Sequence, residues 1–188
     1  MPGPKATIAL WGPDNSVILV GHEDGSISTF DPVTGDQLKS IHPHELAITD
    51  IQFSPKPDKA FFISSSKDSS AKIFETETLQ ALKTYKTDRP VNSASIGPLK
   101  RQIILGGGQE AMAVTTTSAR QGKFEVQFYH MVFEDEIGRV KGHFGPVNSL
   151  AWMQGGEGFV SGGEDGYIRV HFFDDDYWTF SYDEEEEL

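Results

Sequence analysis

The feature that most constrains this chain is an internal repeat of about 44 residues. Residues 20–27, 64–71 and 161–168 share one pattern, in which a short β-type run leads through small polar residues and an aspartate into a second β-type run. The three aspartates are Asp24, Asp68 and Asp165. Two β-type runs joined by such a turn indicate a β-hairpin. Repeated hairpins therefore form the framework of this chain.

The spacing of the aspartates predicts a fourth hairpin. Asp24 and Asp68 are 44 residues apart, whereas Asp68 and Asp165 are 97 apart, which leaves room for one more unit and an insertion. Residues 103–110 fill that place, with Glu110 where the other units have aspartate. The chain is therefore expected to contain four repeats.

Two further strands are expected to flank each hairpin. Inner strands are predicted at residues 8–13, 48–55, 91–98 and 147–152, and outer strands at 37–41, 79–85, 125–130 and 177–182. Four strands in about 44 residues is the period of a β-propeller blade. The sequence thus predicts an all-β propeller of about four antiparallel blades over residues 1–182. The units are expected at about 6–42, 43–87, 88–140 and 141–182, with an acidic tail at 183–188.

Composition excludes several classes of protein. The chain has 28 Asp and Glu against 16 Lys and Arg, a net charge of −12, and it contains no cysteine. An acidic chain lacks the clustered bases of a nucleic-acid surface, so direct RNA binding is not expected. The absence of cysteine excludes disulfides and thiolate metal sites. Apolar runs are far shorter than the roughly 20 residues of a membrane helix, so we expect a cytoplasmic protein without membrane contact.

Particular residues carry a resemblance to a known family. Gly142-His143, followed at a distance by Asp165, resembles the framework of WD40 repeats. From about residue 6 onward the chain resembles subunit i of eukaryotic translation initiation factor three, most specifically at residues 88–94, 104–117, 122–125, 138–148 and 161–166. That family is similar to seven-bladed propellers. The resemblance therefore implies that this chain corresponds to about four blades from the C-terminal part.

The resemblance also implies a hydrogen-bonded set inside two blades, which we call a clasp. A clasp joins the histidine of the Gly-His pair, a serine of the second strand and the aspartate of the hairpin turn. The two clasps are His44, Ser64 and Asp68, and His143, Ser161 and Asp165. Phe74 and His171 stand where the family pattern has an indole, so no indole is expected to complete either set.

The clasps use the residue types of a serine hydrolase triad, which makes an enzyme with Ser161 as nucleophile the alternative. A catalytic site is not expected to repeat with the period of the fold, so we expect no catalytic residues. His42, His44 and Glu45 lack a further strong ligand for a metal, and no Gly-Lys-Ser/Thr follows the glycines at 106–108. No metal or cofactor is expected.

The resemblance implies a non-catalytic scaffold subunit of the translation initiation factor three complex. Such a subunit supports mRNA recruitment and scanning on the small ribosomal subunit through protein–protein contacts. The implied partners are the C-terminal helix of subunit b, subunit g and, indirectly, the 40S pre-initiation complex. A WD40 adaptor in a signalling complex is the alternative within the same fold.

A docking site for the helix is hypothesised at one rim of the second unit. Asp50 lies on the inner strand and Lys67 and Asp68 lie on the hairpin turn, two places that we expect near the same rim. Asp50 is expected to be exposed and without a structural role, because Ser93 and Ser149 hold its position in other units. The hypothesis is that Asp50, with Asp68, receives basic side chains of the helix.

Overall fold

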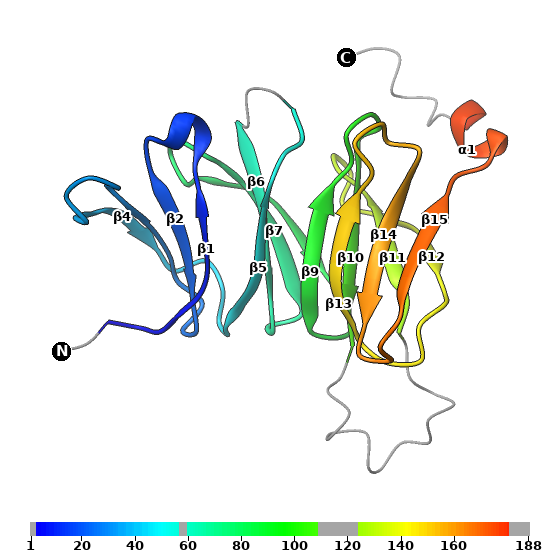
Figure 1. The fold of residues 1–188 in the computed structure, drawn as a ribbon, viewed down its shortest axis with the longest axis horizontal. Helices are drawn as coiled ribbons and strands as arrows, with labels where there is room; N and C mark the ends of the chain where they lie inside the picture. Colours follow the sequence, from blue (N-terminus) through cyan, green and yellow to red (C-terminus); the bar gives the residue numbers. More distant parts are fainter. Residues whose placement is uncertain (1–2, 57–59, 109–123, 181–188) are drawn as a thin grey trace, which may run out of the picture.

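The computed structural model describes residues 3–56, 60–108 and 124–180. Within them the chain forms four antiparallel sheets, which we call blades 1 to 4 and which follow one another in chain order (Figure 1). Blade 1 contains β1 (Ala6–Trp11), β2 (Ile18–His22), β3 (Ile27–Phe30) and β4 (Gln37–Ile41). Blade 2 contains β5 (Ile48–Phe53), β6 (Phe61–Ser66), β7 (Ser70–Glu75) and β8 (Ala81–Lys86). The expectation of an all-β, partial propeller is confirmed.

The other two blades lie at the C-terminal end of the arc. Blade 3 contains β9 (Val91–Ile96), β10 (Gln102–Gly107), β11 (Val126–His130) and β12 (Glu136–Val140). Blade 4 has three strands, β13 (Val147–Trp152), β14 (Gly158–Gly163) and β15 (Ile168–Phe172). A 3-10 turn, Pro13–Asn15, and one α-helix, α1 (Asp175–Thr179), complete the described elements. Among the residues that the structure describes, no helix is long and apolar enough to cross a membrane.

The turn between the second and third strands has the same chemistry in blades 1, 2 and 4. The side chain of its aspartate accepts a hydrogen bond from the backbone N–H two residues further on, and the residue between them has a positive φ. These pairs are Asp24 with Gly25 (φ 88°), Asp68 with Ser69 (φ 66°) and Asp165 with Gly166 (φ 79°). An aspartate followed by a residue that accepts the left-handed region favours this turn. The corresponding turn of blade 3, with Glu110, lies outside the described residues.

The apolar cores lie between successive blades. Consecutive residues of a strand point to opposite faces, so Phe62 of β6 faces blade 1 while Ile63 packs toward blade 3. The core between blades 1 and 2 includes Leu19, Ile48 and Phe62; the next includes Ile63, Tyr85 and Leu105; the last includes Ile104, Phe128 and Phe159. Each core therefore joins two neighbouring blades.

Blade 4 buries one face and exposes the other. Ile168, Val170 and Phe172 alternate along β15 and are 76%, 52% and 71% exposed. Their neighbours on the strand, Arg169 and His171, belong to the opposite face. An apolar sheet face at the end of the arc is therefore open to solvent.

One predicted strand in the third unit is wrong. Residues 125–130 were expected to form the outer strand, but β11 pairs directly with β10, in a register that joins Gln102 to His130. The outer strand is β12, paired with β11. The insertion between β10 and β11, most of which lies outside the described residues, displaced the expected position of the third strand.

The predicted outer strand of the last unit, residues 177–182, is also wrong where the structure describes it. Asp174 caps the N-terminus of α1 by accepting a hydrogen bond from the backbone N–H of Tyr177 at 3.1 Å. Asp175 and Asp176 follow in the first turn, where negative charge favours a helix. Phe173 stacks on Tyr177, with ring centroids 3.8 Å apart. The acidic tail at 183–188 lies outside the described residues.

Candidate functional site

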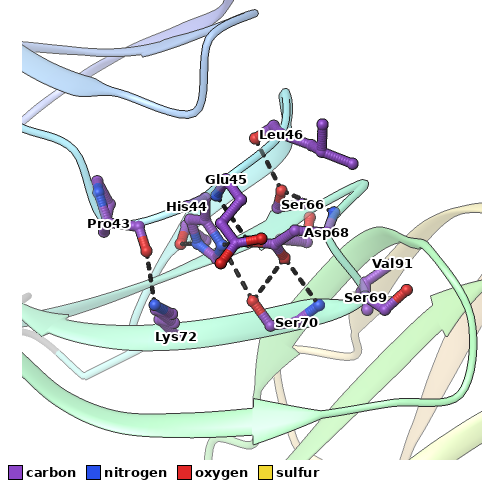
Figure 2. A network of polar contacts seen from close by, with 12 residues as sticks. Pro43, His44, Glu45, Leu46, Ser66, Asp68, Ser69, Ser70, Lys72 and Val91 are labelled. Atoms are coloured by element: carbon purple, nitrogen blue, oxygen red, sulfur yellow. Dashed lines mark hydrogen bonds and ion pairs between the residues drawn. The ribbon is translucent and has the colours of Figure 1, made fainter.

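The structure brings together the three residues of the blade 2 clasp, of which Figure 2 labels His44 and Asp68. Nε2 of His44 lies 2.7 Å from Oγ of Ser64, and Nδ1 lies 2.9 Å from Oδ2 of Asp68. The same Oδ2 accepts the backbone N–H of Glu45 at 3.1 Å. Since a carboxylate can only accept, Nδ1 of His44 carries the proton and Nε2 accepts from the serine hydroxyl.

The surroundings of this clasp fix its charges. Burial lowers the pKa of His44, while Asp68 opposes the shift. For Asp68 burial acts to raise the pKa, but hydrogen bonds from Ser70 and the nearness of His44 outweigh it and leave that pKa lowered. At neutral pH the clasp therefore joins a neutral imidazole to an ionised carboxylate.

The loop that carries His44 is anchored on both sides (Figure 2). Nζ of Lys72, on β7, donates to the carbonyl of Pro43. Oγ of Ser66, at the end of β6, donates to the carbonyl of Leu46 at 2.9 Å. The imidazole is thus presented to the sheet by a loop with a fixed backbone.

The blade 4 clasp has nearly the same geometry. Nε2 of His143 lies 2.8 Å from Oγ of Ser161, and Nδ1 lies 3.0 Å from Oδ1 of Asp165. The backbone N–H of Phe144 donates to Oδ2 of Asp165 at 3.0 Å. Burial acts to raise the pKa of Asp165, but the hydrogen bonds from Phe144 and His143 outweigh it, so that pKa lies well below its usual range. The contribution of both clasps to stability stays a prediction.

Sequence reasoning missed two members of the blade 4 set. Nη1 of Arg169 donates to Oδ2 of Asp165 at 3.1 Å. Nε2 of His171 lies 3.4 Å from Oγ of Ser161, so the residue at the expected indole position does take part. Arg169 stands at the strand position that Lys72 holds in blade 2. Both lie four residues after the turn aspartate, so this spacing in the sequence could have identified Arg169.

A second missed residue type lies two positions after the turn aspartate. Ser70 Oγ donates to Oδ1 of Asp68 at 2.6 Å and lies 3.1 Å from Nδ1 of His44. Ser26 holds the same place in blade 1 and donates to Oδ1 of Asp24 at 2.6 Å. The Asp-x-Ser spacing, repeated in two units, could have identified both serines.

The expectation that Asp50 is exposed and without a structural role is wrong. Its Oδ2 accepts hydrogen bonds from Oγ of Ser93 at 2.6 Å and from Nε2 of Gln52 at 2.9 Å. Gln52 also donates to the carbonyl of Leu150, whose N–H donates to Ser93. Burial raises the pKa of Asp50, opposed by the bonds from Ser93 and Gln52. Because the inner strands converge, this side chain meets blade 3 instead of solvent, and the network joins blades 2, 3 and 4.

Lys67, the third residue of the hypothesised docking site, is exposed on the β6–β7 turn. It lines a pocket of about 620 Å³ together with residues from the inner strands of all four blades, among them Thr49, Asn92 and Asn148. Nδ2 of Asn92 donates to Oδ1 of Asn148 at 3.0 Å. The pocket lies near the point where the inner strands converge, and the docking role of Lys67 stays a prediction.

The geometry of the clasps bears on the hydrolase alternative. Ser64 and Ser161 are both completely buried, so neither hydroxyl is open to a substrate. A serine nucleophile has to reach the scissile carbonyl. Within the described ranges no group of three or more His, Asp and Glu side chains is placed to hold a metal ion.

Three four-stranded blades and one three-stranded blade, with His–Ser–Asp clasps in two of them, define a partial WD40-type β-propeller. A family model described as EIF3I matches residues 1–183. Eukaryotic translation initiation factor 3 subunit I from Aspergillus oryzae is 57% identical over 185 residues, which cover 97% of this chain and 55% of that protein. The protein of the same name from Sclerotinia sclerotiorum is 54% identical over 186 residues, which cover 98% of this chain and 55% of the relative.

This chain belongs to the family of subunit I of eukaryotic translation initiation factor 3. It spans about half the length of the curated relatives that it matches.

Proposed function

We propose that this chain acts in the cytoplasm as a non-catalytic scaffold in translation initiation. The observation that carries the proposal is 57% identity over 185 residues to a protein named as a subunit of an initiation factor. Its buried clasp serines and rigid blades favour a role in presenting surfaces to other proteins. In this role it supports mRNA recruitment and scanning on the small ribosomal subunit.

The proposed partners are other subunits of initiation factor 3, in particular the C-terminal helix of subunit b and subunit g. Contact with the 40S pre-initiation complex is indirect. The test is affinity purification of the tagged chain from cells, followed by quantitative mass spectrometry. Enrichment of the other subunits supports the proposal, whereas a purified chain without any of them contradicts it.

The docking surface for subunit b is proposed at the rim of blade 2 that carries the β6–β7 turn. Lys67 and Asp68 lie on the turn. Asp50 lies on the neighbouring inner strand, but its carboxylate is directed to Ser93 of blade 3, so Asp68 and Glu45 supply the acidic groups of the proposed rim. Glu45 lies beside the clasp, because its backbone N–H donates to Asp68, and its side chain is exposed (Figure 2). An acidic rim of this kind is complementary to a basic helix.

Charge reversal tests this surface. Glu45→Lys should weaken binding of the subunit b segment about tenfold and leave the fold intact, because its side chain is exposed. Glu77→Lys is the matched control, since Glu77 is an exposed acid on the β7–β8 turn at the opposite end of the same blade. Equal affinities of both variants and the parent would remove this rim from consideration.

A further inference from the structure

Blade 1 contains half of a clasp. The backbone N–H and Oγ of Ser26 donate to Oδ1 of Asp24 at 2.9 and 2.6 Å. In blade 2 the corresponding groups of Ser70 donate to Oδ1 of Asp68 at 3.0 and 2.6 Å. The other oxygen of Asp68 accepts from His44, whereas no hydrogen bond within the described residues reaches the other oxygen of Asp24. The aspartate acceptor is therefore held in the same way in both blades, whereas a histidine donor is bonded to it only in blade 2.

Strand register shows where the donor would come from. Ala6 of β1 pairs with His22, and Ile48 of β5 pairs with Ser66; these partners each lie two residues before the turn aspartate. His44 precedes Ile48 by four residues, so the same spacing in blade 1 leads to Pro2. Proline has no imidazole. The position that the register indicates therefore holds no histidine in this chain.

A pocket of about 570 Å³ lies at this place and is lined by Gly3, Pro4, His22, Asp24, Ser26 and Ser28 among others. His42 also lines it, but no hydrogen bond within the described residues joins His42 to Asp24. His22 is only 6% exposed, and its Nε2 lies 3.1 Å from Oγ of Ser28. Its Nδ1 is buried and has no hydrogen-bond partner within the described structure. A buried polar atom without a partner is unfavourable, which points to a ligand that carries a polar group into this pocket.

We propose that this pocket is a receptor for a histidine on a loop of another blade of the same repeat type. The incoming imidazole donates from Nδ1 to the free oxygen of Asp24, as His44 does to Asp68. Val20 stands at the register position of Ser64, so the second ring nitrogen meets no serine there. The hydroxyl of Ser28 donates to Oγ of Ser40, so Nε2 of His22 donates to Ser28 and Nδ1 of His22 is an acceptor. A protonated incoming imidazole satisfies both acceptors, with one N–H on Asp24 and the other on His22.

Two observations favour this occupant over other ligands. In both complete clasps, in blades 2 and 4, the aspartate carboxylate accepts one hydrogen bond from a loop histidine and another from the backbone N–H of the residue after that histidine. The relatives are also almost twice as long as this chain, so the family sequence has room for further blades. The proposal does not depend on the role in translation.

The test uses a synthetic peptide with the sequence of residues 140–146, VKGHFGP, which forms the loop of the blade 4 clasp. The matched control is the same peptide with His143→Ala. NMR titration of the full chain should shift the backbone amides of Gly25 and Ser26 with the histidine peptide only. Absence of these shifts, or equal shifts with the alanine peptide, would overturn the proposal.

Two protein variants sharpen the test. Asp24→Asn should weaken peptide binding about tenfold, because it removes a charged acceptor, while Asp36→Asn on the exposed β3–β4 turn should not change it. Equal affinities of the Asp24→Asn protein and the parent for the peptide would contradict the proposal. Circular dichroism confirms that each variant is folded.

Discussion

Blade 2 and blade 4 contain the same clasp in different surroundings. Blade 2 has four strands and packs on both faces, so that Phe62, Ile63 and Phe74 are all essentially inaccessible to solvent. Blade 4 has three strands and leaves Ile168 and Phe172 largely exposed. The two histidines nevertheless make hydrogen bonds of nearly equal length, 2.7 and 2.9 Å against 2.8 and 3.0 Å. Clasp geometry is therefore set by the loop and turn within a blade, and inter-blade packing is a separate contribution.

The largest expected difference between the blades concerns this packing. Phe62→Ala should lower the free energy of unfolding by about 3–5 kcal/mol, because it leaves a cavity where the ring stacks on Phe74. Phe172→Ala, in the exposed face of blade 4, should change it by less than about 0.5 kcal/mol. Urea denaturation measures both values. Similar losses in the two variants would mean that the blade 4 face is covered in solution.

The clasps should contribute less, and by similar amounts. His44→Ala and His143→Ala should each cost about 1–3 kcal/mol, since each leaves a buried serine hydroxyl and a carboxylate partly unpaired. The same urea titrations give the comparison. A His143→Ala protein with the stability of the parent that has lost partner binding would identify His143 as a contact residue instead.

A smaller effect is expected from the network that joins blades 2, 3 and 4. Burial raises the pKa of Asp50, so the folded protein holds this proton more tightly than the unfolded chain. Its contribution to stability therefore increases as the pH falls from neutral toward about 4, and the ionised form is the unfavourable one. Asp50→Asn keeps an acceptor for Ser93 without the charge and should be more stable than the parent at neutral pH.

The difference in stability between Asp50→Asn and the parent should narrow as the pH is lowered. Thermal or urea titrations at several pH values would measure it. Asp36→Asn, an exposed acid in a turn, is the control. A difference that is independent of pH would show that Asp50 does not titrate as described.

The smallest effect on stability is expected from the exposed face of blade 4. Phe172→Lys should leave the free energy of unfolding within about 0.5 kcal/mol of the parent. We expect the chain to self-associate through this exposed apolar face, and Phe172→Lys to reduce the association, because a charge on an exposed apolar sheet blocks further packing. Light scattering coupled to size-exclusion chromatography measures this. Unchanged association would show that the chain self-associates through a surface other than the exposed face of blade 4.

The repeat made the hairpins and clasp residues predictable. Asp24, Asp68 and Asp165 recur at spacings that fix the turns, and the turn chemistry depends on residues next to them in sequence. His44 and His143 follow from the family pattern because each lies a similar distance before its aspartate. Local spacing is enough to place groups that meet within one blade.

Features that depend on neighbours were not predictable in this way. The inward direction of Asp50 depends on Ser93 in the next blade, and no local pattern encodes that contact. Trp178 and Phe180 alternate along the chain, as side chains on one face of a strand do. The capping aspartate Asp174 and the stacking of Phe173 on Tyr177 nevertheless favour the helix α1. The insertion between β10 and β11 shifts the third strand of blade 3, β11, to the place where the 44-residue repeat predicts the outer strand. Tertiary contacts and competing local signals account for the differences.

The structural role of the clasps, which join loop, strand and turn within one blade and perform no chemistry, is tested most directly at Ser161. The measurement is labelling of the folded chain with a fluorophosphonate probe, followed by mass spectrometry of the peptide that contains Ser161. Because this hydroxyl is completely buried and bonded to His143, no labelling above that of a Ser161→Ala control is expected. Stoichiometric labelling at Ser161 of a protein that stays folded would contradict the structural role and support a hydrolase.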